Sequence, residues 1–311
     1  MHKILVVGGT GFIGLHLIQN LLNEGFKVAS ISKKKRKIKN RAKFFFLDLS
    51  KKIDQNLINK IQADTIVYAA SLNNIDAEKN FLNGYKIGHL SLVNLLNSNN
   101  IKKRLKKIIF LSTAQVYQYY TRKNINLESK VYPKTAYSLF HILTENYLKY
   151  FSLKYKIKTT CLRISNGYGE PYLDKTNCWS IAVNSFCLQA FKDKIIKINT
   201  NPYEYRNFIY VKDISNEITL NIKKKQKEYF LIKNIGSNQN YTLKNVAKII
   251  KEIFKSFLKT NIKIVYNKKK QRKIKIFKYE NNNMLRTKDL TNLRMGIFNL
   301  IKFIKINNGK V

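Results

Sequence analysis

Acidic residues are scarce in this sequence. The 311 residues include 18 Asp and Glu against 59 Lys and Arg, which gives a formal net charge of +41. Such a charge would attract nucleic acid, anionic lipid or a phosphorylated substrate. The basic runs are spread over residues 33–43, 101–107 and 267–278, and they form neither one arm nor an aromatic-rich strip. We therefore interpret the charge as a general use of lysine, and we do not expect a nucleic-acid partner.

Cysteine and long apolar runs are also rare. The three cysteines, Cys161, Cys178 and Cys187, are odd in number and include no CxxC pair, so we expect neither a disulfide framework nor a metal site. No apolar run approaches the about 20 residues of a membrane span, and the apolar stretch at residues 4–7 is too short for a signal-peptide core. These absences predict a cytoplasmic protein.

Apolar residues make up 44% of the chain, enough for a large core, and their spacing predicts strands that alternate with helices. The predicted strands are 3–7, 27–32, 42–49, 64–70, 106–113 and 158–165, and the predicted helices are 11–23, 55–62, 85–98 and 135–155. Such alternation is typical of βαβ units, so we predict an α/β fold with a doubly wound parallel sheet. Ligands of such sheets bind at the carboxyl ends of the strands.

The alternation stops near residue 166, which predicts a second unit. We assign residues 1–166 to the first domain and 167–311 to a smaller α/β domain at the C-terminal side. Residues 207–233 contain an apolar strand and helix that we expect to return to the first domain. The second domain would then be built from 167–206 and 234–311, with helices near 180–192, 241–258 and 297–306.

The stretch KILVVGGTGFIG, residues 3–14, places four glycines between the first strand and the first helix. Glycines at this junction allow a sharp turn and let backbone N–H groups approach a pyrophosphate at the helix N-terminus. Two registers fit: Gly9, Gly11 and Gly14, or Gly8, Gly11 and Gly14. Either register predicts a dinucleotide-binding turn.

Further motifs follow in order. The series consists of GGTGFIG, FLDLS (46–50), VYAAS (67–71), LSTAQVY (111–117), YSLFHILTE (137–145), LRISNGYGEP (162–171), RNFIYVKDI (206–214) and NIGSNQNYTLKNVA (234–247). Together these motifs resemble those of the NAD-dependent epimerase/dehydratase family, the extended short-chain dehydrogenases/reductases. The resemblance covers nearly the whole chain. It implies a Rossmann sheet, a substrate-binding C-terminal domain and an enzyme acting on nucleotide-sugars.

The resemblance also implies the site residues. Tyr137, Thr113 and position 141 would be catalytic, with Tyr137 as the acid/base at the substrate oxygen. Gln115, Asn166 and Arg206 would bind the substrate. The cofactor would contact Gly8, Gly11, Phe12, Ile13, Gly14, Ser32, Asp48, Leu49, Ala69, Ala70, Tyr137 and His141.

Position 141 departs from the family, which has lysine there. A phenol has a pKa of about 10 and needs a nearby positive charge to act as a base at neutral pH, whereas an imidazole is charged only below about pH 6.5. We therefore expect weaker activation of Tyr137. Ala114 and Gln115 stand where family dehydratases carry Asp and Glu, which disfavours dehydration and leaves an epimerase or a 4-keto-sugar reductase.

The sequence leaves the cofactor open between NADP and NAD. Ser32 occupies the position at the end of the second strand where NAD enzymes place an acid, and it is followed by KKKR. The absence of this acid and the presence of nearby cations would suit the 2′-phosphate of the cofactor, and they therefore favour NADP. The resemblance further implies a homodimer through the helices that follow the fourth and fifth strands. The alternative hypothesis is a catalytically altered family member that binds nucleic acid or another polyanion.

Overall fold

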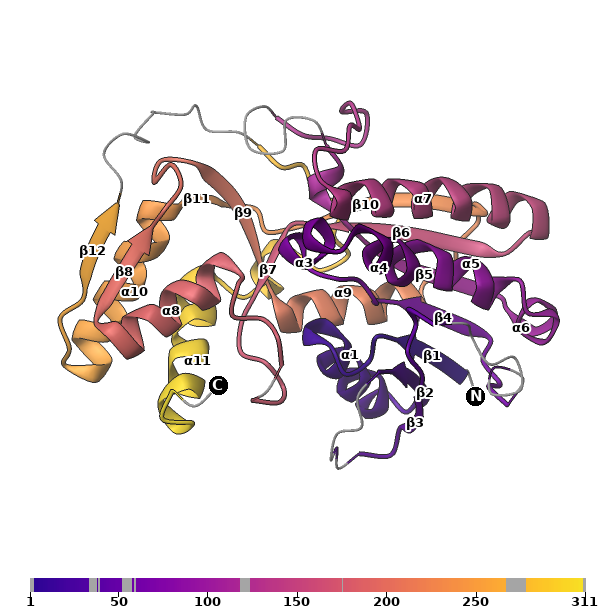
Figure 1. The fold of residues 1–311 in the computed structure, drawn as a ribbon, viewed down its shortest axis with the longest axis horizontal. Coiled ribbons are helices and arrows are strands. Elements are labelled where there is room, and N and C mark those ends of the chain that lie inside the picture. Colours follow the sequence, from indigo (N-terminus) through magenta and orange to yellow (C-terminus); the bar gives the residue numbers. More distant parts are fainter. Residues whose placement is uncertain are drawn as a thin grey trace.

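We describe a computed structural model of the protein. It describes residues 3–33, 38, 40–51, 58, 60–117, 124–174, 176–266 and 278–309. The predicted helix at 55–62 and the basic run at 267–278 lie largely outside these residues. Figure 1 shows a large sheet flanked by helices, with a smaller group of elements that includes α8, α10, α11, β8 and β12 beside it.

The central sheet has seven strands, all parallel, in the order β10-β6-β5-β4-β1-β2-β3. Their bounds are β1 Lys3–Val7, β2 Lys27–Ser32, β3 Lys43–Phe46, β4 Thr65–Tyr68, β5 Lys107–Thr113, β6 Lys158–Ile164 and β10 Phe230–Ile235. This is the predicted doubly wound α/β sheet, because the chain moves outward from β1 in both directions. The third strand is shorter than predicted and ends at Phe46, so Asp48 follows it in a loop.

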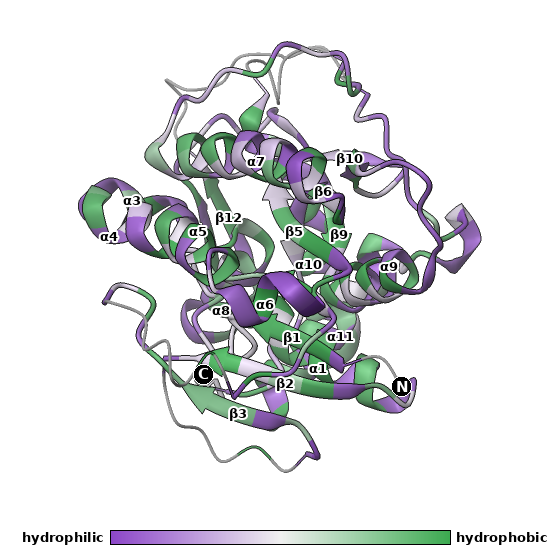
Figure 2. Ribbon diagram, turned by 90° about the vertical axis from the view of Figure 1, so that its right-hand side faces the viewer, coloured by the Kyte–Doolittle hydropathy of each residue, from purple (hydrophilic) through white to green (hydrophobic). Residues whose placement is uncertain are grey.

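Helices cover both faces of the sheet, as the alternating side chains of its strands require. In β1, Ile4 and Val6 belong to one apolar cluster and Leu5 and Val7 to the other. The first cluster includes α1 (Phe12–Asn23) and α9 (Val211–Lys223), and the second includes α5 (Ser91–Leu96) and α7 (Ala136–Tyr155). The central strands are accordingly apolar along most of their length (Figure 2).

A smaller group of elements packs around a separate core. It contains a three-stranded sheet β11-β9-β7, a two-stranded sheet β12-β8 and three helices. Their bounds are β7 Asn166–Tyr168, α8 Ala182–Asp193, β8 Ile195–Ile198, β9 Tyr205–Tyr210, β11 Asn240–Thr242, α10 Leu243–Leu258, β12 Lys263–Tyr266 and α11 Leu293–Ile306. Between β9 and β11 the chain returns to the large sheet: α9 packs on α1, and β10 pairs with β6.

The segment predicted as one helix at 85–98 is interrupted. It consists of α4 (Phe81–Tyr85), a π-helical turn (Lys86–Leu90) and α5, preceded by α3 (Asn74–Lys79), while α6 (Asn99–Arg104) follows. Two carbonyl oxygens of the π turn accept side-chain hydrogen bonds. The Tyr68 hydroxyl donates to Ile87 O at 2.5 Å, and Thr144 Oγ1 donates to Gly88 O at 3.0 Å. These bonds connect the turn to β4 and α7, and apolar spacing alone does not reveal them.

No helix among the described residues is both long enough and apolar enough to cross a bilayer. The same residues contain no group of three or more His, Cys, Asp and Glu side chains arranged to hold a metal ion.

Candidate active site

The glycine turn connects β1 to α1 at the carboxyl edge of the sheet. Gly8 has a φ of +86°, and a Cβ there would lie 2.9 Å from the backbone nitrogen of Ala70. A Cβ on Gly14 would lie 2.4 Å from Gly8 O. Both positions therefore require glycine. Gly11 is the N-cap of α1, and Phe12 and Ile13 begin the helix, whose first turn contains no acidic residue. This helix N-terminus is suited to an anion.

Ala69 and Ala70 lie directly against this turn. They follow β4, the neighbour of β1, and the Ala69 N–H donates to Val7 O at 2.9 Å. The carbonyl of Ala69 would be 3.0 Å from a Cβ on Gly8. The structure thus brings together the glycines and the two alanines that the sequence assigned to one cofactor surface.

The ends of β2 and β3 differ in detail from the expectation. The Ser32 side chain is buried, with its hydroxyl 3.2 Å from that of Ser30. Asp48 forms an ion pair of 3.0 Å with Lys33. Partial burial opposes ionisation of Asp48, but hydrogen bonds from Ser50 and Lys33 outweigh it and lower the pKa of Asp48 to about 2. Leu49 packs against the core. In the sequence Lys33 is one of four consecutive cations after Ser32. Its ion pair with Asp48 could be found only from the structure.

Thr113 and Tyr137 meet beyond the end of β5. Thr113 is the last residue of β5, and Tyr137 lies in the first turn of α7. The Thr113 side chain lies close enough to Tyr137 to favour the ionised phenol. The backbone N–H of Gln115 donates to Thr113 Oγ1 at 3.2 Å, so the threonine hydroxyl keeps its own proton for donation. Burial raises the pKa of Tyr137, and the interaction with Thr113 offsets part of that rise.

His141 lies one helical turn after Tyr137 and contacts it edge-on. The ring centroids are 4.4 Å apart, and Phe110 covers the imidazole from another side at 5.5 Å. His141 is 5% exposed, and neither ring nitrogen has a hydrogen-bond partner within the described structure. Burial lowers the pKa of His141 to about 3, so the imidazole is neutral at physiological pH.

A buried ion pair supports this part of α7. Arg163 of β6 binds Glu145 through two hydrogen bonds, Nε to Oε1 at 3.0 Å and a terminal nitrogen to Oε2 at 2.6 Å. The hydroxyl of Ser112 also donates to Glu145, at 2.5 Å. Glu145 is one turn beyond His141, so the pair fixes the helix against β5 and β6. Arg163 therefore has a structural partner here.

Asn166 and Arg206 lie on the neighbouring strands β7 and β9. The Asn166 amide donates to Asn207 O at 2.8 Å. Arg206 forms a long ion pair of 3.5 Å with Glu204, and its buried Nε atom has no hydrogen-bond partner among the described residues. The buried hydroxyl of Ser165, next to Asn166, also lacks one. Buried donors without partners are costly unless a ligand completes them.

Comparisons with known proteins agree with this architecture. The profile of the NAD dependent epimerase/dehydratase family matches residues 4–236. A Methanocaldococcus jannaschii protein described as a candidate UDP-glucose 4-epimerase is 28% identical over 262 residues, which are 80% of this chain and 81% of that protein. An Escherichia coli dTDP-4-dehydro-6-deoxyglucose reductase is 26% identical over 264 residues, 79% of this chain and 80% of the reductase.

Solved structures share the fold over almost the whole chain. The Thermotoga maritima UDP-glucose 4-epimerase, crystallised with UDP-glucose, superposes with a TM-score of 0.80 at 21% identity and covers 98% of this chain and 99% of its own. A Bacillus cereus UDP-glucuronic acid 4-epimerase in complex with UDP-glucuronic acid and NAD gives a TM-score of 0.79 at 20% identity, with the same coverage. The motifs, the sheet and the family profile lead to one conclusion: the chain belongs to the NAD dependent epimerase/dehydratase family.

Proposed function

We propose that this protein is an NAD(P)H-dependent reductase of nucleotide-linked 4-keto sugars. The Tyr137 hydroxyl would donate the proton to the keto oxygen. The observation that carries the proposal is the pairing of Tyr137 with a buried, uncharged and unpartnered His141. The relatives include both epimerases and a reductase. The pairing of Tyr137 with His141 favours the reductase activity.

The chemical argument concerns which proton state Tyr137 holds when substrate arrives. An epimerase must first remove a proton from a sugar hydroxyl, which requires a phenolate. Burial raises the pKa of Tyr137, and the interaction with Thr113 offsets part of that rise. Among the residues that the structure describes, no cation lowers this pKa, so Tyr137 keeps its proton at neutral pH. A protonated phenol is the acid that reduction of a ketone needs.

The residues fit a dinucleotide cofactor. The turn at Gly8 and Gly14 leaves the N-terminus of α1 free for a pyrophosphate. The unpartnered nitrogens of His141 can hydrogen-bond ribose hydroxyls. When bound, NAD(P)H supplies the hydride that reduces the keto carbon. Thr113 donates a hydrogen bond to the same keto oxygen, and Tyr137 transfers its proton there, which completes the alcohol.

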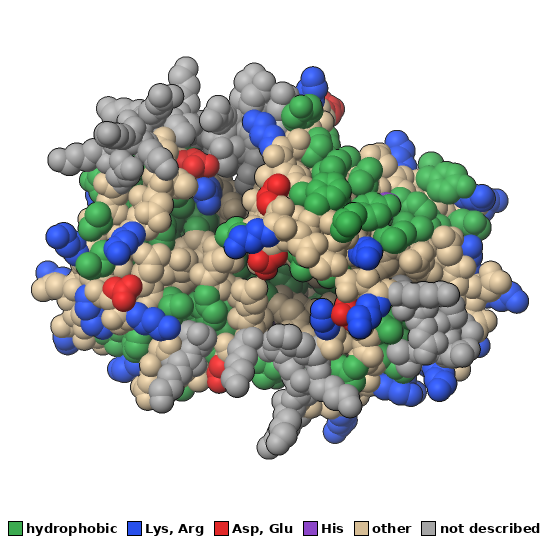
Figure 3. All heavy atoms as spheres, in the orientation of Figure 1, with side chains coloured by type: hydrophobic (Ala, Val, Ile, Leu, Met, Phe, Trp, Pro, Cys, Tyr) green, Lys and Arg blue, Asp and Glu red, His purple; other side chains and the backbone are tan. Residues whose placement is uncertain are grey.

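The substrate end is assigned to Asn166, Arg206 and Gln115. The unpartnered Nε of Arg206 suits one oxygen of a nucleotide diphosphate, because guanidinium binds phosphate through a planar fork of donors. Gln115 lies two residues after Thr113 and would contact a sugar hydroxyl. We also propose that the protein forms a homodimer through α3, α4 and α7, whose outer faces expose apolar side chains (Figure 3).

Two parallel incubations test the proposed activity. With a nucleotide-linked 4-keto-6-deoxy sugar and NADPH or NADH, we expect one reduced cofactor to be oxidised for each alcohol formed. With UDP-glucose and NAD, we expect no UDP-galactose. Conversion of UDP-glucose without net change of the cofactor would instead identify an epimerase and contradict the proposal.

A further inference from the structure

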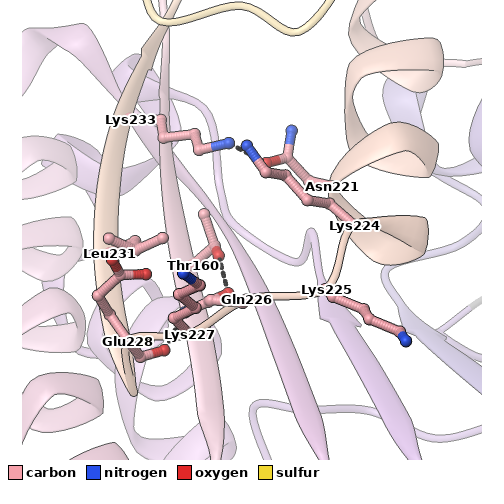
Figure 4. A pocket seen from close by; sticks show the side chains of 9 residues that line it. All are labelled: Thr160, Asn221, Lys224, Lys225, Gln226, Lys227, Glu228, Leu231 and Lys233. Atoms are coloured by element: carbon pink, nitrogen blue, oxygen red, sulfur yellow. Dashed lines mark hydrogen bonds between the residues drawn. The ribbon is translucent and has the colours of Figure 1, made fainter.

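A basic hollow lies at the edge of the central sheet opposite to the candidate active site. It is formed where α9 ends and where β6 and β10 begin, and its volume is about 330 Å³. Figure 4 shows the side chains around it. They are Thr160, Asn221, Lys224, Lys225, Gln226, Lys227, Glu228, Leu231 and Lys233. Four of the nine are lysines, and only one is acidic.

Two of these lysines converge. In Figure 4 the ammonium groups of Lys233 and Lys224 point toward one another beside Asn221, and Lys233 Nζ donates to Asn221 Oδ1 at 2.7 Å. Burial and then the charge of Lys224 lower the pKa of Lys233. The ammonium groups of Lys224, Lys225 and Lys227 make no hydrogen bond or ion pair with any part of the chain that the structure describes. Positive charge is therefore concentrated here, although Glu228 lines the hollow and the charge of Glu217 offsets part of the lowering of the pKa of Lys233.

Two lysines near the hollow, Lys107 and Lys223, bind other groups of the protein. Lys107 donates to three carbonyl oxygens at the C-terminus of α9, those of Asn221, Ile222 and Lys224, and so neutralises the negative end of that helix. Lys223 pairs with Glu24 at 2.7 Å. The α9 terminus thus has its cation already, and the convergence of Lys224 with Lys233 serves no structural purpose of this kind.

We propose that this hollow binds the phosphate group of a small phosphorylated molecule. Two neighbouring ammonium groups repel each other. A doubly charged phosphate group between them would remove the repulsion, and its oxygens would accept hydrogen bonds from both. The lysines gather in one recess and do not form a stripe along a face, which favours a small anion over a nucleic-acid backbone. The site is separate from the candidate active site, and the inference does not depend on the proposed function.

Residue-resolved lysine labelling tests the inference. Pyrophosphate serves as the probe, and an N-hydroxysuccinimide acetate, which acylates only neutral amines, serves as the reagent. A bound anion raises the pKa of Lys233, so saturating pyrophosphate should slow labelling of Lys233 and Lys224 about tenfold. Lys251, exposed on α10, is the internal control and should change less than about twofold. Peptide mass spectrometry reads each lysine separately, so pyrophosphate bound elsewhere does not confuse the result.

Matched variants complete the design. Lys224→Gln removes one converging ammonium. It should raise the pyrophosphate concentration that half-protects Lys233 from labelling about tenfold. Lys225→Gln removes the same charge, but this side chain points away from the pair in Figure 4. In this variant pyrophosphate should protect Lys233 as well as it does in the parent. Absence of saturable protection overturns the inference, as does equal loss in both variants. Stronger protection by single-stranded RNA than by pyrophosphate would overturn it in favour of a nucleic-acid site.

Discussion

His141 is the residue that most affects how the candidate site would work. The imidazole occupies the position where the family has lysine, contacts the Tyr137 ring at 4.4 Å and is neutral because burial lowers its pKa to about 3. A neutral neighbour leaves the phenol protonated. The family motif could be read from the sequence, but the charge state could not, because it depends on packing between Tyr137 and Phe110.

The pH dependence of reduction should reflect this arrangement. Tyr137 is competent as an acid while protonated, that is, at pH values below its raised pKa. Because His141 titrates near pH 3, its protonation should add no inflection to kcat between about pH 5 and 8. Reduction should decline only in the alkaline range. An inflection near pH 6.5 that disappears in His141→Gln would contradict this description.

His141→Lys should open the reverse reaction. An ammonium beside the phenol lowers the pKa of Tyr137 and stabilises the phenolate that alcohol oxidation needs. We expect the oxidation rate at neutral pH to rise about tenfold or more, measured with the alcohol product and oxidised cofactor. His141→Gln, which adds no charge, is the control and should leave that rate low. Equal rates in the two variants would show that charge at position 141 does not govern the direction.

Lys33 gives a prediction about cofactor choice. Its ammonium lies 3.0 Å from Asp48 at the end of β2 and β3, where the family resemblance places the adenosine. A cation there favours a 2′-phosphate, so Lys33→Ala should weaken NADPH binding about five- to tenfold and NADH binding much less. Calorimetric titration measures both. Lys27→Ala, at the opposite end of β2, should change neither, and a loss of NADH affinity equal to that of NADPH would exclude the assigned role.

At the scale of elements, α7 is held in place by the buried pair of Glu145 and Arg163. Glu145→Ala leaves the guanidinium without its partner among buried residues, which should lower the free energy of unfolding by about 3–5 kcal/mol. Glu252→Ala breaks the exposed ion pair with Arg294 and should cost at most about 1 kcal/mol. Urea denaturation compares the two, and similar losses would mean that the Arg163 pair does not hold the helix.

Element prediction succeeded where apolar spacing was regular. Helix α7 and most strands of the large sheet are close to the predicted ranges because their apolar residues repeat with the right period, but β10 was not predicted as a strand. The π turn at Lys86–Leu90 was missed because the apolar spacing of this segment fits a continuous helix, and the turn's side-chain contacts come from Tyr68 and Thr144, residues distant in sequence. The early end of β3 at Phe46 also escaped prediction, since FLDL continues the apolar pattern.

At the scale of the whole molecule, one face of the large domain exposes more apolar side chains than a monomer needs. The exposed fractions are 50% for Phe81, 67% for Leu82, 56% for Tyr150 and 55% for Leu153. Leu143 and Tyr150 are seven residues apart on α7 and share one side of that helix. Contiguous apolar surface of this kind is typical of an interface between proteins.

A substitution on this face tests the homodimer. Leu82→Glu would place a charge in the interface and should convert a dimer into a monomer in light scattering after size-exclusion chromatography. Ile306→Glu changes an equally exposed side chain, 70% exposed, at the far end of α11 and should leave the dimer intact. A parent protein that is monomeric at micromolar concentration would contradict the proposal.

The arrangement of the large sheet was predictable because the motifs follow one another in the family order, and several of them mark the ends of its strands β1, β4, β5 and β6. The basic hollow was not predictable. Its lysines come from the segment that follows α9 and from β10, and the same composition occurs throughout the chain. Only the fold shows that Lys224 and Lys233 converge.

In the proposed reaction, Tyr137 transfers a proton to a keto sugar beside a bound nicotinamide. The most direct measurement compares the parent with Tyr137→Phe in two assays, calorimetric titration with NADPH and NADH and turnover of a nucleotide-linked 4-keto sugar. We predict that the variant binds the cofactor within about twofold of the parent and loses at least about 10²-fold in kcat. Turnover of the variant at the parental rate, or a parent that binds neither cofactor, would contradict the account.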